Sequence, residues 1–222
     1  DVPFIKIPSA LITDLELIKK TTETDKKIII STGMSTLDEV DAAVKTILDT
    51  NKNASYAVLH CNSSYPAPFK DINLKYLIRL SEIGACEVGY SGHERGINVA
   101  IASLGFGARI IEKHFTLDRN LPGPDHKASL EPEELKKMVV AVRNVEKAMG
   151  NGVKRPSPSE AKNLTIARKS LVAVHTIHKG EVFCETNLTV KRPGTGLSPM
   201  RWDEVLGCKA PRDFEIDELI EL

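Results

Sequence analysis

This sequence has few cysteines, no net charge and no long apolar run. Its 222 residues include only Cys61, Cys86, Cys184 and Cys208, with no C-x-x-C pair. Such scattered cysteines predict reduced thiols, as in a cytosolic protein. The 30 basic and 30 acidic residues cancel, and no basic face with interleaved aromatics is visible, so nucleic acid is not an expected partner.

The apolar runs exclude a membrane span. The longest of them, such as residues 27–31 and 139–142, are far shorter than a bilayer requires, and no secretory signal is visible. We therefore expect a cytoplasmic protein with no membrane partner. The composition, 41% apolar and 27% charged, is typical of a globular chain with one large domain, or a large and a small one.

The chain does contain a repeat of strand-like and helix-like segments. Strand-like segments start near residues 4, 28, 56, 86 and 109, with helical patterns between them. Five such units in succession predict a parallel barrel or a doubly wound sheet. An eightfold barrel needs about 250 residues, so we expect the carboxyl-terminal part of a longer protein that lacks about three βα units.

The pattern changes after residue 150. A charged amphipathic helix over residues 131–149 is closed by Gly150-Asn151-Gly152, a typical helix end, and a Pro/Ser-rich stretch follows. From about Arg168 onward the chain reads as short strands and turns. The predicted organisation is residues 1–152 as part of a barrel, 153–164 as a linker and 165–222 as a small, mostly β module.

Polar residues follow the strand-like segments, and the carboxyl ends of parallel strands meet at one rim. The residues expected on this rim are Lys6, Ser9, Ser31, Ser63, Tyr65, Ser91 and His93. Hydroxyls, backbone N–H groups and a lysine suit an anionic ligand. The alternative for Lys6 is a side chain that extends into solvent.

Two histidines end neighbouring segments. His93 lies just past the fourth segment and His114 ends the fifth, where two-residue periodicity puts Glu112 and His114 on one face, opposite Ile111 and Phe115. Neighbouring parallel strands lie about 5 Å apart, so both imidazoles could reach one point. This favours a two-histidine metal site with open positions. The alternative is two unrelated histidines, one in a loop and one hydrogen-bonded at a strand end.

Other polar residues also leave two interpretations. Glu112 could move a proton or hold a sugar hydroxyl, or simply pair with Lys113 or Arg109. Asp125 and His126 lie in a Gly/Pro-rich loop, where a lid or substrate loop is expected, although turns also favour Asp.

Three further residues are expected to be structural or solvated. Cys61 resembles a nucleophile by position, but free cysteines are usually buried. His60 could face the barrel interior or be a hydrogen-bonded structural histidine, and Arg192 lies alone in a turn.

Seven motifs occur in order along nearly the whole chain: K-I-P-S (6–9), S-T-G-M (31–34), L-H-C-N-S-S-Y-P (59–66), G-Y-S-G-H-E (89–94), E-K-H-F-T (112–116), G-P-D-H-x-x-S-L (123–130) and K-R-P-G-x-G (191–196). As a set they resemble the sialic acid synthase family, which includes the legionaminic and pseudaminic acid synthases. The resemblance implies a (β/α)8 TIM-type barrel, of which only about the last five βα units are present, followed by an antifreeze-like (SAF, β-clip) domain. It also implies a domain-swapped homodimer in which this domain caps the partner's barrel.

The resemblance implies an activity as well. The family condenses phosphoenolpyruvate with an N-acetylated amino sugar, typically N-acetylmannosamine in its open aldehyde form, to give a nine-carbon 2-keto acid and phosphate. C3 of phosphoenolpyruvate attacks the aldehyde, water adds to the resulting C2 cation, and phosphate leaves by C–O cleavage.

The family's roles transfer to matching positions of this sequence. By similarity, His93 and His114 hold a divalent metal, Mn²⁺ or Mg²⁺, which polarises the aldehyde, and Glu112 and Tyr65 are the expected catalytic residues. Tyr65 and Asp125 match sugar contacts, and Arg192 matches an arginine that reaches the acetamido group from the neighbouring subunit. The positions that match phosphoenolpyruvate contacts are Lys6, Ser9, Ser31, Ser63, Tyr65 and Ser91.

Two departures limit the transfer. The first three barrel strands, which carry another glutamate and another lysine in the family, are absent, so the chain by itself is expected to be inactive. Gly92 stands where many bacterial members have aspartate, which leaves the sugar subclass open.

Two other functions remain open. One is another phosphoenolpyruvate-dependent or aldolase-type barrel acting on a phosphosugar, although few of the basic residues it would need are visible on the rim. The other is a non-catalytic carbohydrate-binding fragment, in which residues 165–222 should fold and bind alone.

Overall fold

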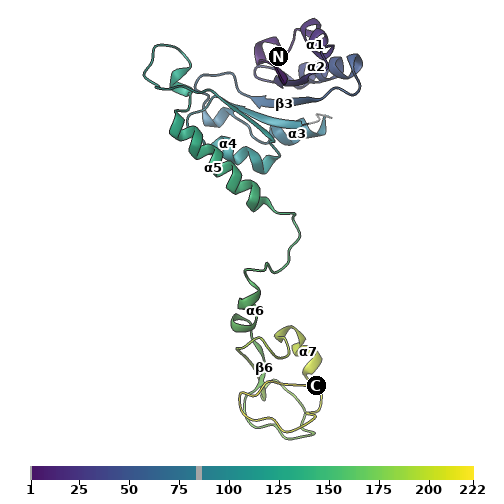
Figure 1. Ribbon diagram of the computed structural model, residues 1–222. Coiled ribbons are helices and arrows are strands. Elements are labelled where there is room, and N and C mark those ends of the chain that lie inside the picture. The colour runs from purple at the N-terminus through teal and green to yellow at the C-terminus, as the bar shows by residue number, and fades with distance from the viewer. Residues whose placement is uncertain (1, 84–86) are drawn as a thin grey trace. The chain divides into compact units, whose positions relative to one another are not determined.

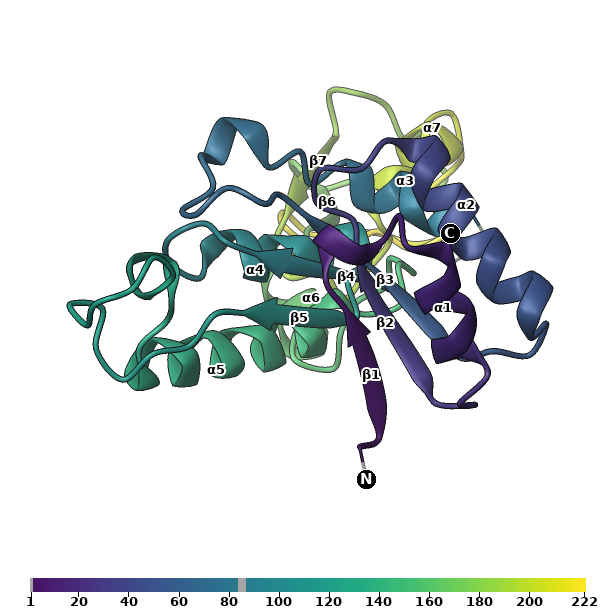
Figure 2. The same cartoon turned by 90° about the horizontal axis from the view of Figure 1, so that it is seen from above.

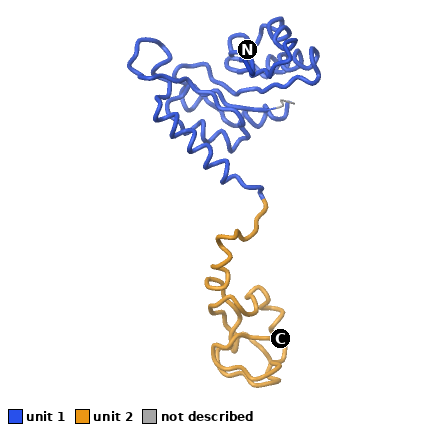
Figure 3. Tube along the Cα trace, viewed as in Figure 1, with its two compact units in different colours: residues 1–152 blue, residues 153–222 orange. Residues whose placement is uncertain are grey.

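The computed structural model describes residues 2–83 and 87–222. The chain divides into two compact units, Asp1–Gly152 and Val153–Leu222 (Figure 3). Each unit has its own hydrophobic core, so each is described by itself.

The first unit is built on a parallel sheet whose strands are neighbours in chain order. The strands are β1 (Phe4–Ile7), β2 (Lys27–Ser31), β3 (Tyr56–Cys61), β4 (Glu87–Gly92) and β5 (Ile110–Lys113). Each pair of neighbours runs parallel, and the sheet curls like part of a barrel wall (Figure 2). The predicted succession of five βα units is confirmed.

The helices of this unit lie around the outside of the curled sheet (Figure 1). They are α1 (Leu15–Thr22), α2 (Leu37–Thr50), α3 (Tyr76–Glu82), α4 (Asn98–Ser103) and α5 (Pro132–Met149), with the 3-10 turns η1 (Ser9–Leu11), η2 (Phe69–Asp71), η3 (Leu104–Phe106) and η4 (His126–Ala128). Local chemistry sets several helix starts. Thr36 and Glu39 form a capping box at α2, and Asp14 caps α1.

The two faces of the sheet differ in composition because side chains alternate along each strand. On the helix face, Ile7, Ile28 and Val58 pack with residues of α1 and α2 in the main core. The opposite face, called the inner face below, has a small apolar layer of Ile29, Ala57, Leu59 and Ile110. Toward the carboxyl ends of the strands the inner face becomes polar, and this is where a ligand could bind.

The second unit is a small module with little regular structure. Its elements are α6 (Ala161–Ala167), the antiparallel pair β6 (Ser170–Ala173) and β7 (Leu188–Lys191), η5 (Pro199–Arg201) and α7 (Trp202–Val205). Its core includes Leu171, Phe183 and Phe214.

Helix α6 shortens the predicted linker. It begins at Ala161, inside residues 153–164, and the N–H of Gly194 donates to the carbonyl of Thr165 at 2.8 Å. This bond ties the helix to the module, so ordered structure begins before the predicted position 165. Its short apolar pattern gave no signal at the sequence level.

Two predictions from composition can be compared with the described residues. Within 2–83 and 87–222, none of the helices combines the length and the hydropathy needed to cross a bilayer. Cys61, Cys184 and Cys208 are free thiols, as predicted, and Cys86 lies outside the described residues.

Candidate functional site

A cavity of about 410 Å³ opens at the carboxyl ends of the strands. It gathers the predicted site residues of the first unit, apart from Asp125, from widely separated positions in the sequence. The cavity is lined by Lys6, Pro8, Ser9, Ala10, Ser31, Met34, Cys61, Ser63, Tyr65, Ser91, His93, Glu112 and His114. Asp125 does not line it, and Arg192 belongs to the other unit.

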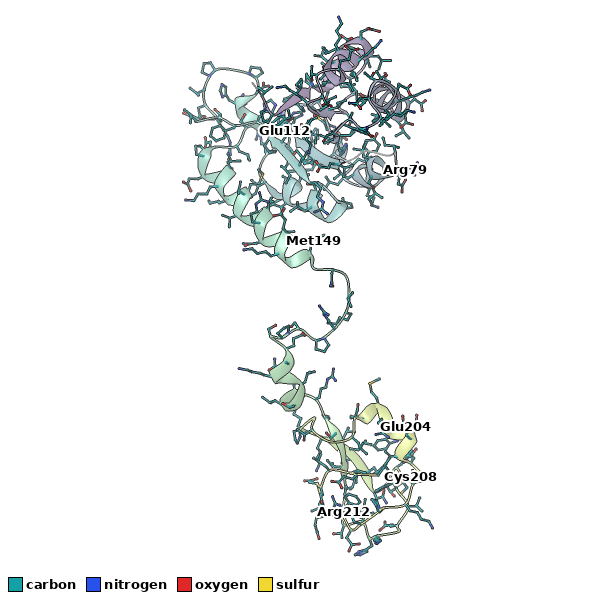
Figure 4. The ribbon with its side chains drawn as sticks, turned by 45° about the vertical axis from the view of Figure 1, so that its right-hand side comes forward. Arg79, Glu112, Met149, Glu204, Cys208 and Arg212 are labelled. Atoms are coloured by element: carbon teal, nitrogen blue, oxygen red, sulfur yellow. The ribbon has the colours of Figure 1, made fainter. Side chains whose placement is uncertain are left out.

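Strand alternation explains how the inner-face residues converge. Ser91 and Glu112 are direct partners across β4 and β5, and Lys6 lies on the same face. Nζ of Lys6 lies 3.1 Å from Oε1 and 3.0 Å from Oε2 of Glu112, and the hydroxyl of Ser91 donates to Oε1 at 2.7 Å. Glu112, labelled in Figure 4, therefore binds both neighbours.

The ion pair between Lys6 and Glu112 excludes the alternatives that the sequence left open for these two residues. Lys6 does not extend alone into solvent, and Glu112 does not pair with Lys113 or Arg109. Side chains adjacent in a strand point to opposite faces, which separates Glu112 from Lys113. The two side chains keep 25% and 38% of their exposure, so an incoming anion could compete for Lys6.

Three loops form a cradle beside Lys6. The N–H of Gly33 donates to Oγ of Ser9 at 2.9 Å. A Cβ atom at residue 33 would lie 2.1 Å from Oγ of Ser63 and 2.8 Å from Oγ of Ser9, so only glycine fits without displacing these hydroxyls. Sequence reasoning missed Gly33, although it stands within the S-T-G-M motif.

Ser31 adds a free hydroxyl to this cradle. Among the described residues, its buried Oγ has no hydrogen-bond partner. Buried polar groups are normally satisfied, so an unpaired hydroxyl on a cavity wall indicates a place for a ligand oxygen.

The two histidine rings meet edge to face on the cavity wall. Their ring centroids are 5.0 Å apart at 84°, and Tyr65 lies 4.1 Å from the ring of His93 and 5.4 Å from that of His114. Nδ1 of His93 donates to the carbonyl of Asn62 at 2.7 Å. This bond assigns the proton to Nδ1 and leaves Nε2 of His93 free to bind a ligand.

The spacing of the rings fits a shared metal ion. A metal bound at about 2.1 Å from a ring nitrogen lies about 3.2 Å from the ring centroid, so rings 5.0 Å apart can reach one ion. In the described part of the chain, no three His, Cys, Asp or Glu side chains form a metal-holding group. A metal held by these two imidazoles would keep open positions for substrate and water.

Electrostatics distinguishes the two imidazoles. Burial lowers the pKa of His93, but its hydrogen bonds with Cys61 and Asn62 outweigh this effect and raise that pKa above the ordinary value. Burial, and then the charge of His93, lower the pKa of His114. Cys61 is buried as expected, yet it lines the cavity, and although burial opposes the shift, hydrogen bonds with His93, Ser9 and Ser91 lower the pKa of its thiol.

Three candidates are not among the residues that line the cavity. His60 points to the helix face, where Nε2 bonds the carbonyl of Ile72 and the ring packs 5.2 Å from Tyr76, so it is the hydrogen-bonded structural histidine that the sequence allowed. Asp125 is half-exposed with Oδ2 3.8 Å from Nδ1 of His114. Arg192 is exposed and donates to the carbonyl of Ala167 at 3.2 Å.

His126 holds the loop that carries Asp125. Its Nδ1 lies 2.8 Å from Oγ1 of Thr116, which joins the two ends of the loop. The turn interpretation therefore describes His126 better than a role in binding a substrate.

Sequence reasoning also missed a polar cluster on the helix face. Lys113, considered only as a partner of Glu112, instead pairs with Glu94, whose carboxylate also accepts from Tyr90. Burial of a charged pair gives no sequence signal, because charged residues on strands are normally exposed.

Comparison with known proteins identifies the lineage of both units. The NeuB family model matches residues 1–154 and the SAF domain model residues 168–221. The chain is 50% identical over 216 residues to an N,N'-diacetyllegionaminic acid synthase of Campylobacter jejuni, covering 97% of this chain and 65% of the relative. It is 35% identical to the N-acetylneuraminate-9-phosphate synthase of Homo sapiens, covering 99% of this chain and 61% of that protein.

A solved structure agrees with these relatives. The N-acetylneuraminic acid synthetase of Leptospira borgpetersenii, in complex with citrate, aligns with a TM-score of 0.68 and 34% identity over 73% of this chain and 56% of that one. The chain thus spans less than two thirds of the length of these relatives. With a family model matched over most of its length, it belongs to the NeuB family, the sialic acid synthases, and a SAF domain follows its barrel segment in the sequence.

Proposed function

We propose that the protein, at its full natural length, is a nonulosonic acid synthase. It would join phosphoenolpyruvate to the open-chain aldehyde of an N-acetylated amino sugar, consume one water molecule, and release phosphate and a nine-carbon 2-keto sugar acid. The observation that carries this proposal is the pair of histidines, 5.0 Å apart, beside a cavity lined with lysine and serine hydroxyls. The named activities of the relatives support the same reaction class.

Phosphoenolpyruvate would occupy the cradle. Its phosphate and carboxylate need cationic and N–H or O–H donors, and the cavity offers Lys6, Ser9, Ser31, Ser63 and Ser91. Ser31 is suited to this role because its hydroxyl is buried without a partner among the described residues. An arriving anion would take Lys6 from Glu112, since this ion pair is still partly exposed.

His93 and His114 would hold a divalent metal, Mn²⁺ or Mg²⁺, which supplies Lewis-acid polarisation of the aldehyde oxygen. Asn62 keeps Nε2 of His93 available through the bond to Nδ1. Tyr65 packs against both imidazoles and lines the same cavity.

Glu112 is the candidate for proton transfer at the aldehyde oxygen. Ser91 and Lys6 hold its carboxylate in place from either side, and it lines the same cavity as both histidines. Positioning of this kind is what general acid–base chemistry requires first.

The sugar contacts extend beyond the cavity. Asp125 near His114 and Tyr65 on the cavity wall would bind sugar hydroxyls, and Arg192 would reach the acetamido group from the neighbouring subunit of a domain-swapped homodimer. The 50% identity to an N,N'-diacetyllegionaminic acid synthase supports an acceptor with two acetamido groups.

The test is product identification. The full-length protein is incubated with Mn²⁺, phosphoenolpyruvate and one of three hexoses: N-acetylmannosamine, its 6-phosphate, or a hexose with two acetamido groups. We expect mass spectrometry to detect a nine-carbon keto acid, formed fastest from the diacetamido sugar. Absence of any such product with all three sugars would contradict the proposed function, and we expect residues 1–222 alone to give none.

A histidine variant tests the metal assignment within the same assay. His93→Ala should abolish turnover and weaken Mn²⁺ retention together. The matched control is His178→Ala, because His178 lies in the second unit with its side chain 77% exposed, and it should change neither. If His93→Ala retained both properties, the metal assignment would be wrong.

A further inference from the structure

A buried polar cluster lies behind the two histidines, on the helix face of the sheet. It consists of Tyr90, Glu94 and Lys113 and is called the buried triad below. The side chains of Lys113 and Glu94 are 2% and 0% exposed, and Tyr90 is equally buried.

Both carboxylate oxygens and the backbone carbonyl of Glu94 have a hydrogen-bond or ion-pair partner in the cluster. Nζ of Lys113 lies 3.0 Å from Oε1 of Glu94 and donates to the Glu94 backbone carbonyl at 2.6 Å. The hydroxyl of Tyr90 donates to Oε2 at 2.7 Å. Burial and the Glu94 carboxylate raise the pKa of Tyr90, so the phenol stays protonated and remains a donor.

Stability alone does not account for a charged pair at this place. Desolvation of two buried charges offsets most of their attraction, and well-packed apolar residues often stabilise a fold equally well. The surrounding helix face is apolar, with Ala100, Leu130 and Met138 in the same core as Tyr90.

The position of the triad at the strand ends suggests why a charged pair is buried there. Strand β4 ends at Gly92 and β5 at Lys113, and these two residues are the last pair in register. The histidines lie one residue beyond, where the strand ladder no longer joins them. Glu94 follows His93 directly, and Lys113 directly precedes His114.

We propose that the buried triad is a positioning device that fixes the spacing of His93 and His114. Lys113 bonds both the side chain and the backbone of Glu94, so the residue after one histidine is tied to the residue before the other. The inference rests on the metal site of the proposed function. Groups that orient metal ligands in this way typically change metal affinity about 10- to 100-fold when removed.

Gly92 shows how closely the triad is fitted. A Cβ atom at residue 92 would lie 2.7 Å from Oε2 of Glu94 and 2.7 Å from Cε1 of Tyr90. The carboxylate of Glu94 therefore fills the space in which any side chain of residue 92 would begin. A carboxylate attached to residue 92 would enter the same space, provided that residue 94 were smaller.

The first test removes the triad's charges together. The full-length double variant K113M/E94L keeps similar side-chain volumes and leaves no unpaired buried charge. We expect it to stay folded by circular dichroism, with a lower melting temperature because the buried Tyr90 hydroxyl loses its acceptor, and to bind Mn²⁺ about 10- to 100-fold more weakly, measured by the electron paramagnetic resonance signal of free Mn²⁺.

The matched control removes another lysine–glutamate pair of the same sheet. Nζ of Lys27 lies 2.5 Å from Oε2 of Glu87, and these residues begin β2 and β4, at the end of the sheet away from the histidines. K27M/E87L should bind Mn²⁺ as the wild type does. A folded K113M/E94L protein with wild-type affinity would overturn the inference while leaving the proposed function intact, whereas a wild type that binds no Mn²⁺ would overturn both.

The second test moves the carboxylate instead of deleting it. E94T should bind Mn²⁺ more weakly, and G92D/E94T should recover most of the lost affinity, because the G92D substitution returns a carboxylate to Lys113. A merely structural loss at position 94 would not be repaired from position 92. Failure of G92D/E94T to improve on a folded E94T protein would overturn the inference, and should E94T fail to fold, K113M/E94L decides.

Discussion

Two lysine–glutamate pairs lie on opposite faces of strand β5, and each uses one of two adjacent residues. On the inner face Glu112 pairs with Lys6, with side chains 38% and 25% exposed. On the helix face Lys113 pairs with Glu94, at 2% and 0%. The residue types are the same, so burial makes the difference: the first pair can open to admit an anion, whereas the second is a fixed part of the structure.

The largest expected effect tests this difference directly. K113M leaves the Glu94 carboxylate buried without its partner and should lower the free energy of unfolding by about 3–5 kcal/mol. K6M removes a partly exposed charge and should lower it by less than about 1 kcal/mol, while raising KM for phosphoenolpyruvate. Urea denaturation of both variants measures the contrast, and equal destabilisation would remove the distinction between the two pairs.

Gly92 and Gly33 allow the same comparison of the two faces for steric fit. In G92A the new methyl group meets Glu94 and Tyr90 in a packed region, and we expect a loss of about 1–3 kcal/mol of stability. In G33A it meets two hydroxyls on the cavity wall, so stability should change less and KM for phosphoenolpyruvate should rise roughly tenfold. Thermal unfolding and steady-state kinetics separate the two outcomes. The reverse pattern would mean that the cradle is misassigned.

A smaller effect concerns pH and the inner face alone. The pKa of His93 is raised above its ordinary value, and a protonated imidazole cannot bind a metal, so Mn²⁺ affinity should fall as pH decreases through that pKa, by about tenfold per pH unit below it. C61S removes a partner that raises this pKa and should move the midpoint to lower pH. C208S, in the second unit (Cys208 is labelled in Figure 4), should not. An affinity that does not change with pH across the range in which imidazoles titrate would contradict the assignment of His93.

The smallest expected effect lies at the edge of the site. Asp125 is half-exposed near His114, so D125N should raise KM for the sugar by roughly three- to tenfold and leave KM for phosphoenolpyruvate unchanged. E133Q, which neutralises an exposed carboxylate in the first turn of α5, provides a control for the loss of negative charge. Equal effects of both variants would point to long-range electrostatics.

Periodicity made the inner face predictable. Parallel strands end at one edge, and two-residue alternation selects Lys6, Ser31, Ser91 and Glu112 for the same side, so their convergence followed from the sequence. The pairing of the charged side chains could not be predicted in the same way. Adjacent Glu112 and Lys113 looked like partners, but alternation separates them, and the actual partner of Glu112 lies 106 residues away in the sequence. Which lysine meets which glutamate depends on strand register, which one sequence does not reveal.

The sequence also did not predict where side chains of other segments approach the backbone closely. Gly33 and Gly92 are required because side chains from distant or folded-back segments fill the space beside them, and neither has a local turn that would demand glycine. The first helix of the second unit was not predictable for a similar reason, because α6 contacts Gly194, far beyond the helix in the sequence.

The carbonyl of Asn62, the partner of His93, belongs to the same short loop as Ser63 on the cradle wall. A ligand that binds Ser63 and orders this loop would therefore also fix the imidazole of His93. Phosphoenolpyruvate and the metal should each tighten the binding of the other by the same factor, as thermodynamic reciprocity requires. The site would then be ordered by both ligands before the sugar binds.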